Sequence, residues 1–237
     1  MNIYAPIPYI KQPKEMFIVE NPVNEELIEL NNLFKCDSMY NHWAENGGKP
    51  IAGSSPTLYA RKTVVEMLEK AEALLPEGYR FKILDAYRPV KVQQALWDFY
   101  REKIADENPD KSSEQIDNMA VNYVSYPSYD EKQPSLHNTG GAIDVTVEDS
   151  SGIQLNMGCE FDDFSMKATT NFFENNTDLF SEEIKNNRRI LYNVMTEVGF
   201  TNLPSEWWHY DYGDNAWAVL NRKKPIYDGI LDFRRRE

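Results

Sequence analysis

The spacing of apolar residues predicts four helices in the middle and C-terminal parts of the chain. Over residues 62–75, apolar side chains recur every three or four positions, at Val64, Leu68, Ala71 and Leu75. That spacing places them on one face of a helix. Similar patterns predict helices over 90–106, 112–124 and 181–199.

Local signals mark where three of these helices begin. Pro89 precedes the helix over 90–106 and suits a first turn, where its missing N–H costs nothing. Ser112 and Gln115 have the spacing of a capping box. Ser181 is expected as the N-cap of the helix over 181–199.

Two segments are predicted as strands, 79–86 and 142–147. In the second, Ile143, Val145 and Val147 share one face and Asp144 lies on the other. Strands and helices do not alternate in a βαβ rhythm, which favours a single α+β domain over 1–237. Prolines punctuate residues 1–30, which we expect to form an irregular N-terminal arm.

Composition and charge restrict the class of protein. The chain is 41% hydrophobic with a formal charge of −13, which suits a globular fold and disfavours nucleic acid or an anionic membrane as partner. The only dense basic run is Arg234–Arg236. No window is apolar enough for a membrane span, and no secretory signal is visible. We therefore expect a cytoplasmic protein, or a periplasmic one if a signal has been removed.

His137 and Asp144 are the first pair that could carry chemistry. His137 lies in a glycine-containing loop that leads into the strand bearing Asp144. If the turn at Gly140 and Gly141 bends the chain back, an imidazole nitrogen and a carboxylate oxygen could bind one metal ion. The alternative is that both side chains bond only to nearby backbone.

His209 and Glu206 form a second pair. A glutamate three residues from a metal-bound histidine can take a proton from water without being a ligand. The alternative is that His209 belongs to an aromatic core with Trp207 and Trp208. Combined with His137 and Asp144, His209 completes the three ligands typical of a catalytic zinc site.

The chain's remaining histidine and one arginine have weaker signals. Arg88, at a strand-to-helix corner, could stabilise an oxyanion, or it could form a surface ion pair with Asp85. His42 lies in the irregular N-terminal part and is interpreted as structural or exposed.

Together these residues resemble the D-Ala-D-Ala metallopeptidases, whose fold is shared with the hedgehog signalling domain. The match spans about residues 33–212 and is closest to the D-alanyl-D-alanine dipeptidases. It is carried by four motifs in order: Asp85-x-Tyr87-Arg88-Pro89, Ser135-x-His137-x2-Gly140-x-Ala142-Ile143-Asp144, Met157-Gly158-x2-Phe161-Asp162 and Glu206-Trp207-Trp208-His209-Tyr210. Tyr40-x2-Trp43 fits the family's N-terminal part. The fold implied is α+β, with a central antiparallel sheet and surrounding helices.

The resemblance also implies roles for individual residues. One Zn²⁺ per chain would be bound by His137, Asp144 and His209, with Glu206 as general base and Arg88 stabilising the transition state. A small D-amino-acid dipeptide would be held in a pocket lined by Tyr40, Ser135 and Asp162. The family permits homodimers.

Two alternatives to a dipeptidase remain open. One is a D,D- or L,D-carboxypeptidase acting on peptidoglycan stem peptides. The other is a zinc-bearing binding module without catalysis. The N-terminal arm and the loop over 125–134 depart from the family pattern, and either could reshape the mouth of the cleft.

Overall fold

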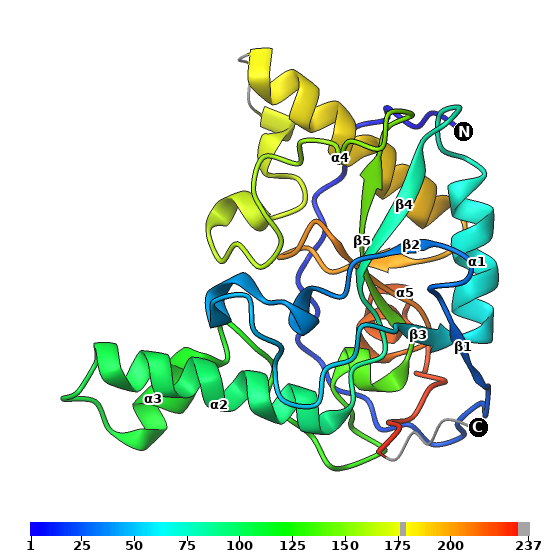
Figure 1. Cartoon of the computed structure of the whole chain (residues 1–237). Coiled ribbons are helices and arrows are strands. Elements are labelled where there is room, and N and C mark those ends of the chain that lie inside the picture. The colour runs from blue at the N-terminus through cyan, green and yellow to red at the C-terminus, as the bar shows by residue number, and fades with distance from the viewer. Residues whose placement is uncertain (176–178, 232–237) are drawn as a thin grey trace.

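A five-stranded sheet lies at the centre of the molecule (Figure 1). The computed structural model describes residues 1–175 and 179–231. In spatial order the strands are β2 (Lys35–Cys36), β4 (Arg80–Asp85), β5 (Ala142–Glu148), β7 (His209–Asp211) and β6 (Thr201–Asn202). All neighbouring pairs are antiparallel except β2 and β4, which are parallel. The predicted antiparallel sheet is therefore mixed at one edge.

Helices cover the sheet and extend beyond it, which confirms the α+β class. They are α1 (Lys62–Glu72), α2 (Val90–Glu107), α3 (Ser113–Ala120), α4 (Leu179–Glu197) and α5 (Asn215–Asn221). Side chains of α1 and α4 share one hydrophobic core with Ile143, Val145 and Val147 of β5. That face of β5 is fully buried, as its alternating pattern predicts.

A second hydrophobic cluster joins α2 and α3 to the segment between β2 and β3 (Tyr59–Arg61). It contains Tyr40 and Trp43 packed against Trp97 and Tyr100 of α2. Figure 1 shows α2 and α3 projecting from the body of the molecule. Because Tyr40 belongs to this cluster, α2 helps to position one predicted site residue.

Several boundaries differ from the sequence-based predictions. The Ser112–Gln115 capping box forms, but α3 ends at Ala120 rather than near 124. Helix α4 begins at Leu179, so Ser181 lies within the helix and not at its N-cap. The predicted arm over 1–30 contains a strand, β1 (Leu27–Glu29), which pairs with β3 (Tyr59–Arg61).

The N-terminal arm before β1 crosses the molecule without helix or strand. Hydrogen bonds to distant segments fix its path. Asn193 of α4 donates to the carbonyls of Ile3 and Ala5, and the Ile7 N–H donates to Glu174. Further on, the Val19 N–H donates to the Lys132 carbonyl. The arm is therefore tied to the folded body along its length.

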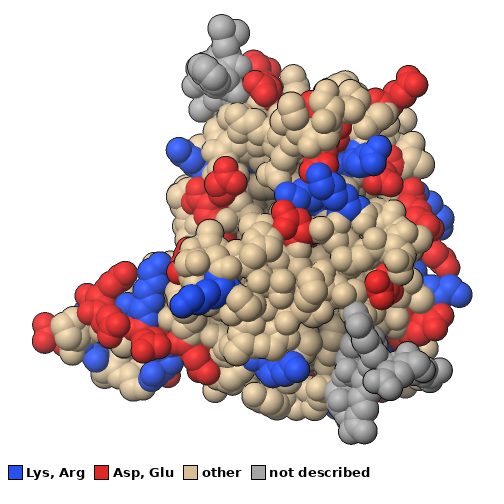
Figure 2. Space-filling view, viewed as in Figure 1, with Lys and Arg blue, Asp and Glu red and all other residues tan. Residues whose placement is uncertain are grey.

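Acidic side chains gather over the projecting end of α2 and α3, where red dominates the surface (Figure 2). The basic run Arg234–Arg236 lies outside the described residues. None of the described helices combines the length and apolar character needed to cross a bilayer.

Gly141 allows β5 to lie close to the chain that follows β7. A Cβ at this position would lie 2.3 Å from the Tyr212 carbonyl oxygen, which is backbone and cannot rotate away. We expect Gly141→Ala to lower the free energy of unfolding by about 3 kcal/mol. Chemical denaturation would measure this.

Gly152→Ala is the control, because the added Cβ meets no atom within 4 Å and should cost only about 1 kcal/mol of backbone strain. Equal losses in both variants would contradict the close-approach argument.

Candidate active site

Strand pairing brings together two of the three predicted metal ligands, Asp144 and His209. Asp144 of β5 and His209 of β7 are direct partners across the antiparallel pair. His137 lies on a 3-10 turn, Leu136–Thr139, that ends at Gly140 with φ 73°. This left-handed residue turns the chain into β5, so His137 and Asp144 converge although seven positions separate them.

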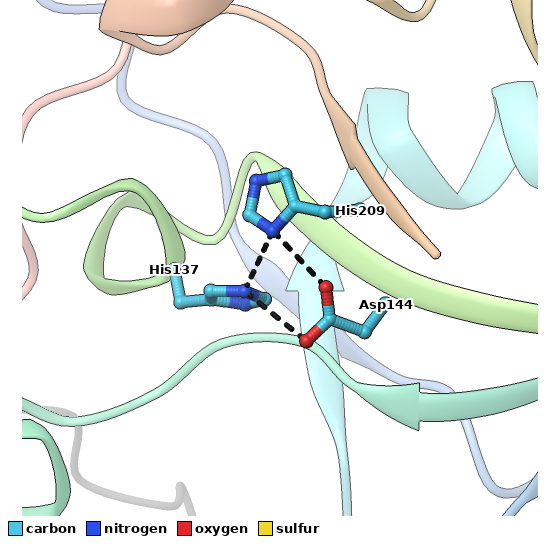
Figure 3. A group of neighbouring side chains, drawn as sticks. All are labelled: His137, Asp144 and His209. Atoms are coloured by element: carbon cyan, nitrogen blue, oxygen red, sulfur yellow. Dashed lines mark hydrogen bonds and ion pairs between the residues drawn. The ribbon is translucent and has the colours of Figure 1, made fainter. Parts of the chain in front are cut away.

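The three side chains face one another in the interior (Figure 3). His137 Nε2 lies 3.2 Å from His209 Nδ1 and 3.4 Å from Asp144 Oδ2. His209 Nδ1 lies 3.0 Å from Asp144 Oδ1. Each residue offers a ligand atom within 4.8 Å of the others, and all three residues are buried. The structure thus assembles a group that could hold a metal ion.

The outer nitrogen of each imidazole has a fixed acceptor. His137 Nδ1 lies 2.8 Å from the Ala86 carbonyl oxygen, and His209 Nε2 lies 2.7 Å from Asp211 Oδ1. Since a carbonyl can only accept, Nδ1 of His137 carries the hydrogen. When both rings are neutral, their inner nitrogens, His137 Nε2 and His209 Nδ1, present lone pairs beside the Asp144 carboxylate. A cation between them satisfies all three groups.

The protonation of each group in this cluster depends on the charges of its neighbours. Burial alone would raise the pKa of Asp144, but contacts with His137 and His209 hold the pKa well below its usual value. Burial alone would lower the pKa of His209, but Asp211 and Asp144 hold it well above its usual value.

Glu206 lies beside the cluster without joining it. Its Oε2 is 3.7 Å from His209 Nδ1, and its side chain is 38% exposed. Partial burial, opposed by His209 and reinforced by the Asp144 charge, raises the pKa of Glu206. The amide of Asn202 donates to the Glu206 and His209 carbonyls and so holds the turn that carries the carboxylate.

Arg88 is buried, so its pair with Asp85 is not the surface ion pair considered from the sequence. Its Nε and Nη2 contact Asp85 Oδ2 at 2.9 and 2.7 Å, and its Nη1 donates to Gln93 Oε1 at 2.9 Å. Nη2 also lies 4.0 Å from Asp144 Oδ2. The guanidinium is therefore held in one orientation next to the cluster.

The three predicted pocket residues line the same cavity. The Tyr40 hydroxyl donates to Asp162 Oδ2 at 3.1 Å. Asp162 has φ 58°, an unusual conformation for a residue other than glycine, and burial raises its pKa well above the usual value. The buried Ser135 hydroxyl has no hydrogen-bond partner among the residues described. An unpartnered hydroxyl in a cavity wall is free to bind a ligand.

All eight predicted site residues border one cavity of about 700 Å³. That volume is typical of a small-molecule site. His42 does not line it and instead contacts Asp37 at the surface. Sequence reasoning missed Gln93, Asp211 and Asn202. Only Asp211 carried a local signal. It lies two positions after His209, and residues at i and i+2 of a strand share one face.

Comparison with known proteins identifies the family. The family model described as D-ala-D-ala dipeptidase matches residues 25–231. This chain belongs to that family of metallopeptidases. Two relatives named D-alanyl-D-alanine dipeptidase come from Synechocystis sp. and Enterococcus faecium. The first is 29% identical over 87% of this chain and 90% of its own length, and the second is 28% identical over 87% and 95%.

A solved structure, VanYB in complex with D-alanine-D-alanine, is more distant. It is 17% identical with a TM-score of 0.41, covering 71% of this chain and 81% of that chain. The family assignment rests on the sequence match.

Removing one imidazole should abolish tight metal binding. We expect His137→Ala to weaken Zn²⁺ binding by at least about 100-fold, because one of three donors is lost. Equilibrium dialysis followed by elemental analysis measures the affinity. The matched control is His42→Ala, which removes an imidazole at the surface and should bind like the wild type. Unchanged affinity in His137→Ala would exclude this cluster as the metal site.

Proposed function

We propose that this protein is a zinc-dependent dipeptidase that hydrolyses D-alanyl-D-alanine. The observation that carries the proposal is the convergence of His137, Asp144 and His209 in a cavity that also contains Glu206. Relatives named for this activity match along most of their own length. The roles of the individual residues are part of the proposal.

The donor set suits zinc. Two imidazole nitrogens and one carboxylate oxygen are ligands that Zn²⁺ favours, and three protein ligands are typical of a catalytic site. When bound, Zn²⁺ would activate water and polarise the scissile carbonyl. Asp211 and the Ala86 carbonyl hold the two rings in the orientation that binding needs.

Glu206 acts as the general base. It accepts a proton from the attacking water and later delivers that proton to the leaving amine. Its raised pKa makes the carboxylate a stronger base toward that water. Its position beside His209, rather than among the ligand atoms, leaves both of its oxygens available.

Arg88 stabilises the charge that develops on the carbonyl oxygen. Asp85 and Gln93 fix the guanidinium beforehand, so little reorganisation is needed during reaction. Asp162 receives the free ammonium group of the dipeptide. Burial raises the pKa of Asp162. An ammonium group bound beside it would lower that pKa again and so favour the charged carboxylate. Tyr40 and Ser135 complete the pocket.

Loss of the Glu206 carboxylate should stop turnover without releasing the metal. We expect Glu206→Gln to lower kcat for D-alanyl-D-alanine by at least about 100-fold, since proton transfer is lost. Zinc content by elemental analysis should stay near that of the wild type. Glu183→Gln, an exposed charge-matched control on α4, should keep full activity. An active Glu206→Gln would eliminate Glu206 as the base.

A substrate panel separates the dipeptidase from its alternatives. Zinc-loaded protein should hydrolyse free D-alanyl-D-alanine and leave L-alanyl-L-alanine intact, as measured by released alanine. Faster cleavage of a pentapeptide stem than of the free dipeptide would instead identify a carboxypeptidase. Zinc binding with no turnover of any D-amino-acid peptide would identify a binding module.

A further inference from the structure

Part of the N-terminal arm forms a wall of the catalytic cavity. Residues 12–16 line it together with Glu206, His209 and Asp162. The family model matches only residues 25–231, so this wall lies outside the matched region. The arm is therefore a feature that the family pattern does not describe, placed where substrate must bind.

Asn215, at the start of α5, clamps the arm on both sides of Met16. Its Oδ1 accepts from the Phe17 N–H at 2.6 Å, and its Nδ2 donates to the Glu15 carbonyl at 2.8 Å. Earlier in the arm, Gln12 Nε2 lies 3.4 Å from Ser205 Oγ, and Ser205 directly precedes Glu206. These contacts hold the wall against the turn that carries the proposed base.

Charge makes this wall relevant to an anionic group. Five carboxylates line the cavity: Glu15, Asp144, Asp162, Asp163 and Glu206. Apart from the two histidines, the cationic residues lining it are Arg88 and Lys14. Arg88 is already engaged by Asp85 and Gln93. Lys14 is exposed, and within the part of the chain that the structure describes it has no ion pair.

A dipeptide substrate carries a free carboxylate as well as an ammonium group. In the proposed function Zn²⁺ and Arg88 serve the scissile carbonyl, so a free carboxylate among these acidic side chains is stabilised by a further cation within reach. Asp162 is suited to the ammonium group. Lys14, on the arm, supplies a positive charge for the substrate carboxylate. Asn215 anchors the arm, whereas Tyr40 contacts Asp162, so the two charged groups are held by different parts of the chain.

We propose that Lys14 binds the free carboxylate of the peptide substrate and that the clamped arm is a specificity element of the active site. This inference rests on the proposed peptidase function. It assigns to the arm a preference for substrates with a free carboxylate close to the scissile bond. The flexible lysine side chain reaches the carboxylate as a point charge.

The test compares free D-alanyl-D-alanine with its C-terminal amide, which lacks the carboxylate. We expect Lys14→Gln to raise KM for the free dipeptide about fivefold, the size of one exposed charge pair. Its kcat should be unchanged, as should its KM for the amide. Lys11→Gln is the matched control, because Lys11 is an exposed lysine on the same arm that does not line the cavity. It should behave as wild type on both substrates.

A second variant tests the clamp. Asn215→Ala removes the hydrogen bonds to Glu15, Met16 and Phe17. We therefore expect a similar rise in KM for the free dipeptide and faster proteolytic cleavage within residues 12–18. Unchanged KM in Lys14→Gln, or an equal rise for the amide, would overturn the carboxylate role. Wild-type protein that turns over neither substrate would instead contradict the proposed function, so the two failures are distinguishable.

Discussion

The register between β5 and β7 is the constraint on which the site depends. Asp144 and His209 meet because they are paired across the two strands. A slip of one residue would move His209 to the opposite face of the sheet. The hydrophobic face of β5 opposes such a slip, because Ile143, Val145 and Val147 would then leave the core.

The buried charges around the cluster are arranged to compensate one another. Arg88 is shared between Asp85 and the neighbourhood of Asp144, and the amide of Gln93 connects it to the Ser125 carbonyl. Charges removed from water are tolerated only when paired and hydrogen-bonded. The α2 helix, through Gln93 and the cluster around Tyr40, therefore supports the chemistry although it lies outside the sheet.

Periodicity and residue chemistry predict the local parts of this structure well. The helices α1 and α2, the strand β5 and the capping box of α3 all follow from spacing and side-chain type. The short strands β2, β6 and β7, each of two or three residues, carry no periodic signal. Their existence depends on pairing partners far along the chain. For the same reason the parallel edge at β2 could not be predicted.

The site shows the same division. The candidate ligands and the proposed base, His137, Asp144, His209 and Glu206, lie in motifs that can be found in the sequence. Their supports, Gln93, Asn202 and the arm, act through contacts whose partners are remote in sequence. The clamp between Glu15 and Asn215 joins residues 200 positions apart. During synthesis the arm leaves the ribosome about 200 residues before its anchor, Asn215. The cavity therefore gains this wall only after α5 has been made.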